Sequence, residues 1–129
     1  MPSPNLFSTV PKHKHLDFYN TSGVVEPRKV VTYFGFSNPE VAAISNISVN
    51  SVRYNEDRIP EPIKQRFSEI ANICELVANQ FDGDLDKTYW WFTTDNPLLG
   101  DISPRQMIKY GNYERLRKLV QDFIAGNVA

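Results

Sequence analysis

Few side chains in this sequence could carry covalent or metal chemistry, and their spacing does not bring them together. Cys74 is the single cysteine, and no histidine or carboxylate is placed to activate its thiol, so we expect a small buried hydrophobe. His13 and His15 flank one lysine, but nothing nearby supplies further metal ligands, which favours a solvated tail. No serine stands in a G-x-S-x-G turn, and the sequence has no glycine-rich phosphate loop. The sequence therefore predicts no catalytic residue, no metal site and no cofactor.

The carboxylates of residues 82–86, Asp-Gly-Asp-Leu-Asp, resemble the start of a calcium-binding loop. Such a loop needs glycine at its sixth position and glutamate at its twelfth, where this chain has Lys87 and Thr93. We therefore expect a turn that ends one helix, with Asp86 capping the next. That next helix holds Tyr-Trp-Trp-Phe at residues 89–92. This is more aromatic surface than one short helix buries, so part of it is expected to face another chain.

Amide, hydroxyl and guanidinium groups in residues 48–54 could instead read the edges of DNA bases. The stretch NPEVAAISNISVNSVRY opens with a helix-start pattern, and a second short helix is expected over residues 48–54. Ala42, Asn46 and Val52 stand where a helix-turn-helix needs a small residue, a left-handed turn residue and an inward apolar residue. The stretch therefore resembles the Xre or Cro-repressor type of helix-turn-helix. Its expected DNA-contacting residues are Ser48, Val49, Asn50, Ser51 and Arg53.

Other helices must hold these side chains in place. Pro27 and Gly35 bound a short apolar stripe and predict a helix between them. Apolar residues at spacings of four and three predict a long helix from Pro62 to Phe81, the spine of a bundle or a dimer seam. Before these helices, residues 1–25 lack apolar periodicity and are expected to form a flexible arm. An anchored patch is expected in that arm at Leu16, Phe18 and Tyr19.

The last third of the chain predicts three connected elements. They are a turn over residues 95–100, a helix over residues 103–111, and a final amphipathic helix that Asn112 caps and Gly126 closes. The inward face of the final helix is expected to carry Leu116, Leu119, Val120, Phe123 and Ile124. The opposite face carries the cations Arg115, Arg117 and Lys118.

Length and composition are those of a small globular protein. The 129 residues carry a net charge of -1, and 41% are hydrophobic. Cations and carboxylates are mixed along the chain, so no global basic face argues for tight, sequence-blind binding of nucleic acid. The opening residues lack the apolar core of a signal peptide, and no stretch approaches the roughly 20 apolar residues of a membrane helix. We therefore expect a cytoplasmic protein without membrane contact.

The C-terminal string NPLLGDISPRQMIKYGNYERLRKLVQDFIAGNVA resembles the toxin-binding domain of the Xre/MbcA/ParS family of bacterial antitoxins. That domain typically has a Trp-containing helix, an Asn-Pro turn with leucines, a Pro-led helix ending in Gly, and a last amphipathic helix. These parts occur in this order at Trp90 and Trp91, at residues 96–99, at residues 104–111 and at residues 113–124. With the helix-turn-helix and the long helix, the resemblance covers the chain from about Arg28 onward.

The resemblance implies an all-α fold, in which a helix-turn-helix N-terminal unit is joined by a long helix to a small helical C-terminal toxin-binding domain. We accordingly divide the chain into residues 1–25, 26–81 and 82–129. The implied partner is a RES-domain toxin, encoded by the adjacent gene, that consumes NAD or transfers ADP-ribose from it. In this family the end of the antitoxin reaches into the toxin's active-site cleft. The toxin-binding residues are then expected to be Arg115, Lys118, Gly126, Asn127, Val128 and Ala129.

The sequence is compatible with three functions. The chain could be an antitoxin that also represses its own operon by binding operator DNA, a stand-alone helix-turn-helix transcriptional regulator without a toxin, or a small enzyme. The enzyme has the least support, because no reactive constellation is present. Residues 48–54 contain one cation, Arg53. Because this charge is sparse, the sequence supports operator binding less than it supports toxin neutralisation. A homodimer is expected, because such proteins read half-sites roughly one DNA turn apart.

Overall fold

The computed structural model describes residues 14–126, and its regular elements in that range are helices. The α-helices are α2 (Pro27–Phe34), α3 (Asn38–Ser45), α4 (Glu61–Gln80), α5 (Leu85–Thr93), α6 (Pro104–Lys109) and α7 (Tyr113–Ile124). Three short 3-10 turns complete the order: η1 (Val49–Ser51), η2 (Glu56–Arg58) and η3 (Pro97–Leu99). Strand-like pairing within residues 14–126 consists of isolated bridges, Tyr19 with Val25 and Asn96 with Ile102. The predicted all-α fold class is confirmed.

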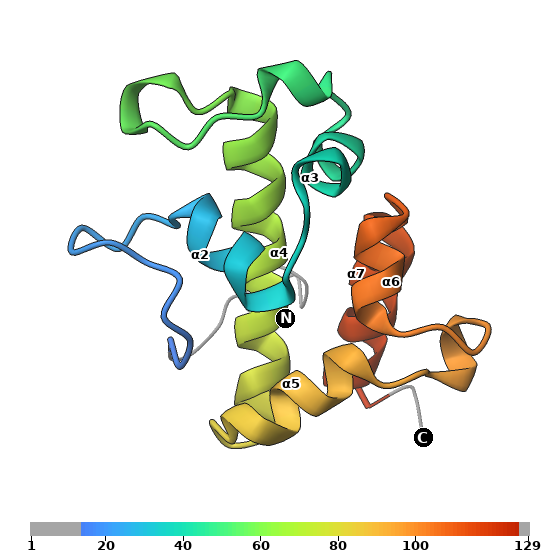
Figure 1. Ribbon diagram of the computed structural model, residues 1–129. Helices are drawn as coiled ribbons and strands as arrows, with labels where there is room; N and C mark the ends of the chain where they lie inside the picture. Colours follow the sequence, from blue (N-terminus) through green and yellow to red (C-terminus); the bar gives the residue numbers. More distant parts are fainter. Residues whose placement is uncertain (1–13, 127–129) are drawn as a thin grey trace, which may run out of the picture.

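The long helix α4 is the spine of the molecule (Figure 1). Helices α2, α3, α5 and α7 all pack against it, and its observed bounds lie one residue from the predicted ones at each end. Its inward stripe is buried throughout, at Ile63, Phe67, Ile70, Cys74 and Val77. These side chains belong to one apolar cluster that extends from Leu16 to Val120, so the N-terminal and C-terminal helices share a core. The division into three units stays a prediction. No helix of the described range has the length and apolar character needed to cross a bilayer.

The start and end signals in the sequence set the bounds of α2 and α3. Pro27 is the first residue of α2, and Gly35 ends that helix with a left-handed φ of 70°. Ser37 accepts a hydrogen bond from the Glu40 backbone N–H, and the Glu40 carboxylate accepts one from the Ser37 N–H at 2.8 Å. This reciprocal capping box starts α3. Asn46 ends α3 with a φ of 58°, which confirms the predicted turn residue.

The prediction of a second helix over residues 48–54 is wrong. The chain forms only the 3-10 turn η1 there, and Val52 leaves that turn with extended backbone angles. Ser48 does cap the turn, since its hydroxyl accepts the Asn50 backbone N–H at 3.3 Å. Val49 and Val52 are β-branched, and Asn50 and Ser51 are short and polar. Such residues lose rotamer freedom in a helix or compete for its backbone hydrogen bonds. Packing does not compensate, because η1 contains no buried residue.

The described part of the predicted arm, residues 14–25, is packed against α4. Leu16 and Phe18 are buried in the core, which confirms the anchored patch and corrects the expectation of a flexible arm for this part. Glu75 of α4 is fully buried, and its carboxylate accepts hydrogen bonds from the backbone N–H groups of His15 at 2.6 Å and of Leu16 at 2.9 Å. Apolar periodicity could not predict this anchor, because the partners lie 60 residues apart.

The C-terminal helices follow the predicted order, with corrections at two caps. Asn112 stands at the N-cap position of α7, but its side chain makes no capping hydrogen bond. Asp84, and not Asp86, caps α5, since its carboxylate accepts the Lys87 backbone N–H at 3.0 Å. Asp86 lies inside the first turn of α5, where its negative charge favours the helix N-terminus. A capping box formed by Ser103 and Gln106 starts α6, and α7 follows after a short turn.

Candidate partner-binding surface

Helix α7 presents a polar face to solvent and an apolar face to the core. Leu116 and Val120 are buried against α4, as predicted from the spacing. Arg115 and Lys118, three residues apart on the outward face, are exposed. Arg117 differs from these two cations, because its guanidinium forms an ion pair with Glu114 at 2.9 Å. Two of the three predicted cations are therefore available to a partner, at the positions that the sequence assigned to toxin binding.

The end of α7 is fixed by aromatic contacts. The Phe123 ring stacks on Trp91 of α5, with centroids 6.4 Å apart and an interplanar angle of 11°. It also lies 6.5 Å from the ring of Phe81, the residue that ends α4. The final turn of α7 thus lies beside α5 (Figure 1). Gly126 follows this turn at the surface, with a φ of 75°.

The remaining predicted toxin-binding residues, Asn127, Val128 and Ala129, lie outside the described range. Their contacts stay a prediction. The structure does describe the chain up to Gly126, which is exposed. Arg115 and Lys118 lie on the outward face of α7, and Gly126 lies two residues beyond Ile124, the last residue of that helix.

Helix α5 exposes part of its aromatic run, residues 89–92, as the density of aromatic residues in the sequence predicted. Trp90 is 62% exposed and Tyr89 is 44% exposed, while Phe92 is fully buried. An exposed tryptophan is a frequent anchor of protein interfaces, because it removes a large apolar area from water on binding. The expectation that part of this aromatic run faces another chain stays a prediction.

The predicted DNA-contacting residues lie close together on and around η1. Ser48, Val49, Asn50, Ser51 and Arg53 are all exposed. They do not form the face of a recognition helix, because residues 52–55 are not helical. A major-groove reader of the usual kind inserts a helix, so the geometry expected for base readout is absent from this segment.

Helix α6 holds the C-terminal third against α2 and α3, which the sequence did not predict. The Arg105 guanidinium donates to the backbone carbonyl of Phe34 at 2.7 Å and lies 4.9 Å from the centroid of the Phe36 ring. The Lys109 ammonium lies 3.4 Å from the Glu40 carboxylate. Both contacts join residues about 70 positions apart, so no local pattern could have indicated them.

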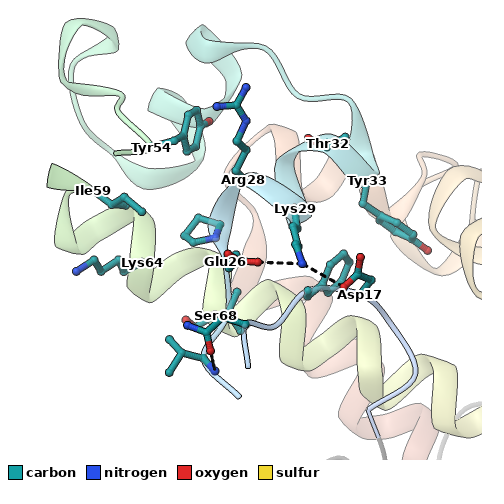
Figure 2. Close-up of a pocket in the computed structure, with 15 residues that line it drawn as sticks. Asp17, Glu26, Arg28, Lys29, Thr32, Tyr33, Tyr54, Ile59, Lys64 and Ser68 are labelled. Carbon is teal, nitrogen blue, oxygen red and sulfur yellow. Dashed lines mark hydrogen bonds and ion pairs between the residues drawn. The ribbon is translucent and has the colours of Figure 1, made fainter. Parts of the chain in front are cut away.

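A groove of about 930 Å³ runs between the N-terminal segment, α2, the Tyr54–Ile59 region and α4. Figure 2 shows Lys29 in this groove between Glu26, 2.9 Å away, and Asp17, 3.2 Å away. Hydrogen bonds to Glu26 and then Asp17 raise the pKa of the Lys29 ammonium. None of the lining residues is a histidine or a cysteine, so the groove offers no Cys-His or Ser-His pair for nucleophilic catalysis. The sequence did not predict this groove, because four separate segments of the chain form it.

Outside this groove, Cys74 is the one thiol of the sequence, and it is buried. Burial raises the pKa of the Cys74 thiol well above its ordinary value, and the charge of Glu75 raises it further. The prediction that Cys74 is a buried hydrophobe is confirmed. No group of three or more His, Cys, Asp or Glu side chains in residues 14–126 is placed to hold a metal ion. His13, the first histidine of the N-terminal pair, lies outside that range.

Comparisons with known proteins give one informative match. No protein-family model matches the chain, and no curated protein matches it. Among solved structures, a chain from the crystal structure of the M. tuberculosis MbcT-MbcA toxin-antitoxin complex is similar, with a TM-score of 0.51 and 24% sequence identity. The match covers 81% of this chain and 94% of that chain. This chain therefore shares its all-α fold with a component of a toxin-antitoxin complex.

Proposed function

We propose that this protein is an antitoxin that neutralises a toxin by binding it. The observation that carries the proposal is the fold, which matches a chain from a toxin-antitoxin complex over nearly the whole of that chain. The order of motifs in the C-terminal third supports the same assignment independently of the structure. The protein acts by occupying its partner's surface and has no chemistry of its own.

The partner is a RES-domain toxin that consumes NAD or transfers ADP-ribose from it. This part of the proposal rests on the resemblance of the C-terminal third to the Xre/MbcA/ParS toxin-binding domain. The exposed cations Arg115 and Lys118 on α7 favour a partner with an acidic surface near its binding site. Such exposed charges act mainly on the rate of association, because solvent and salt screen them.

Neutralisation proceeds by blocking the toxin's cleft. The residues after Gly126 enter the NAD site, while α7 rests on the rim of the cleft. A short segment that follows a helix is suited to this task, because ordering a few residues costs less conformational entropy than ordering a long loop. The exposed position of Gly126 and the fixed final turn of α7 support this mechanism.

Co-expression with the RES-domain toxin of the adjacent gene tests the proposal. Cells that express the toxin alone are expected to lose NAD and stop growing, and cells that express both proteins are expected to keep NAD and grow. The two proteins are expected to co-purify as one complex on gel filtration. Absence of both protection and complex would contradict the antitoxin assignment.

Operator binding and homodimer formation stay predictions. Residues 48–54, which include the turn η1, contain one cation, Arg53, and so provide little phosphate-neutralising charge. A gel-shift titration with the DNA upstream of the operon tests operator binding, and Arg53→Ala is expected to weaken it. Equal affinities for the two proteins would remove Arg53 from any DNA interface.

A further inference from the structure

The groove between α2 and α4 carries more positive than negative charge. Its lining side chains include three cations and two carboxylates. Both carboxylates, Asp17 and Glu26, lie against the Lys29 ammonium, at 3.2 and 2.9 Å. Lys64 lies 3.7 Å from an exposed carboxylate of its own helix, a pair that solvent weakens. Arg28, in the first turn of α2, is exposed and forms no ion pair with a carboxylate that the structure describes, so it is free to bind an anion.

A hydroxyl group without a partner lies beside Arg28. The Tyr54 hydroxyl is shielded from solvent and has no hydrogen-bond partner among the described residues. The Arg28 guanidinium lies 5.7 Å from the centroid of the Tyr54 ring, and Figure 2 shows the two side chains next to each other. Burial raises the pKa of Tyr54, and the charge of Arg28 opposes this shift. A buried hydroxyl without a partner destabilises a protein, so this one indicates a binding role.

Other side chains of the groove are apolar. Val24, Val25, Pro27 and Ile59 line it, and Val24 is 59% exposed. Sites for small molecules typically combine such apolar walls with a few polar groups, in volumes of roughly 300 to 1,000 Å³. The groove, at about 930 Å³, falls within this range. Its chemistry is that of a site for a small molecule with an apolar body and an anionic group.

We propose that this groove binds a small organic acid, whose carboxylate contacts Arg28 and the Tyr54 hydroxyl while its apolar part covers Val24, Val25 and Ile59. A guanidinium offers a carboxylate two parallel N–H donors, and the phenol O–H adds a third donor. The Tyr54 ring has to turn for its hydroxyl to reach the ligand, and residues 52–55 lie outside the helices. None of the lining residues belongs to α7, so this site does not depend on the proposed antitoxin function.

The test uses two probes with the same apolar body, 1-naphthylacetate and its uncharged amide, 1-naphthylacetamide. Each probe is titrated into the isotope-labelled full chain, and the backbone amide signals are followed by NMR to give the Kd and the place of binding. The variants are Arg28→Gln and Tyr54→Phe, with Arg58→Gln as the matched control. Arg58 is also an exposed arginine, but it does not line the groove. The melting temperature of every variant is measured without a probe.

We expect 1-naphthylacetate to bind with a Kd of about 1 mM or below and to shift the amide signals of Val24, Val25 and Arg28. The amide should bind about tenfold more weakly, because it lacks the charge-assisted hydrogen bonds. Arg28→Gln should weaken binding of the acid by about tenfold and leave that of the amide unchanged. Arg58→Gln should change neither affinity.

Tyr54→Phe separates a binding role of the hydroxyl from a structural one. We expect this variant to bind the acid about threefold more weakly, because one hydrogen bond is lost. Its melting temperature should equal or exceed that of the wild type, because the substitution removes a buried polar group that has no partner. A lower melting temperature with unchanged binding of the acid would show that the hydroxyl serves the fold, and would remove it from the site.

Three other results would overturn the proposal. Equal affinities for the acid and the amide, or equal affinities of wild type and Arg28→Gln for the acid, would exclude a carboxylate site at Arg28. Signal changes confined to residues outside the groove would place the probe elsewhere. An acetylated pentapeptide that ends in phenylalanine, if it bound the groove more than about tenfold more tightly than the acid, would replace the small molecule with a peptide ligand. No toxin takes part in these assays, so their outcome leaves the antitoxin assignment to its own test.

Discussion

Replacement of Glu75 tests how the N-terminal segment is attached to the long helix. The Glu75 side chain is fully buried, and its carboxylate accepts the backbone N–H groups of His15 and Leu16 at 2.6 and 2.9 Å. The Tyr19 hydroxyl is a third donor. Burial, followed by the charge of Glu75 and this hydrogen bond, raises the pKa of Tyr19. One carboxylate therefore holds three donors of a segment 60 residues away.

The cost of Glu75→Gln follows from these contacts. The substitution keeps the shape but replaces one acceptor oxygen with an NH2 group, which then faces a backbone N–H. A hydrogen bond to a charged group contributes about 1.5 to 3 kcal/mol, and a buried donor without a partner costs about 1 to 3 kcal/mol. Because these contributions overlap, we expect Glu75→Gln to lower the free energy of unfolding by about 2 to 4 kcal/mol.

Urea denaturation followed by circular dichroism measures this loss, with Glu69→Gln as the control. Glu69 lies on the same helix, but it is partly exposed and pairs with Arg66 at 3.2 Å, so its loss is expected to cost less than about 1 kcal/mol. Exchange of the His15 and Leu16 amide protons should also accelerate in Glu75→Gln. Equal stabilities for the two variants, with unchanged exchange at these amides, would refute the anchoring role.

The charges and the burial of side chains in the structure lead to three further predictions. Hydrogen bonding to the Ser37 backbone N–H lowers the pKa of Glu40 from 4.5. The stability that its carboxylate adds is therefore present above that pH and lost below it, so the difference in melting temperature between wild type and Glu40→Gln should shrink as the pH falls below 4.5. Buried Cys74 should react with a thiol reagent only as fast as the protein unfolds, and rapid labelling of native protein would contradict its burial. Reversing charge at Arg115 and Lys118 should slow association with the toxin and reduce its salt dependence in stopped-flow mixing, whereas an unchanged salt slope would exclude steering by this face.

Local signals in the sequence predicted most of the helices, because their causes lie within a few residues. Pro27 and Gly35 bound α2, and the Ser37–Glu40 box starts α3. The recurrence of apolar residues predicted α4 to within one residue. The failure at residues 48–54 has the opposite cause: the expected helix needed packing to offset poor helix propensity, and η1 has no buried residue to supply it.

The sequence predicted the candidate surface only in part. The outward cations of α7 and the exposed aromatic surface of α5 follow from helical periodicity, and both are found. The Trp91–Phe123 stack, the Arg105 contact with α2 and the Glu75 anchor join residues far apart in the chain. No local pattern encodes such pairs, since each depends on how the finished helices lie against one another.

The most direct test of the central claim is NAD turnover by the purified RES-domain toxin, titrated with the full chain and with a chain that lacks residues 127–129. The truncated chain should keep its melting temperature, because residues beyond the last helix turn add few buried contacts. We expect the full chain to abolish turnover, and the truncated chain to bind the toxin while leaving it active. Full inhibition by the truncated chain would contradict blocking by the tail while supporting the antitoxin role. Undiminished turnover with a saturating amount of the full chain would contradict the antitoxin assignment itself.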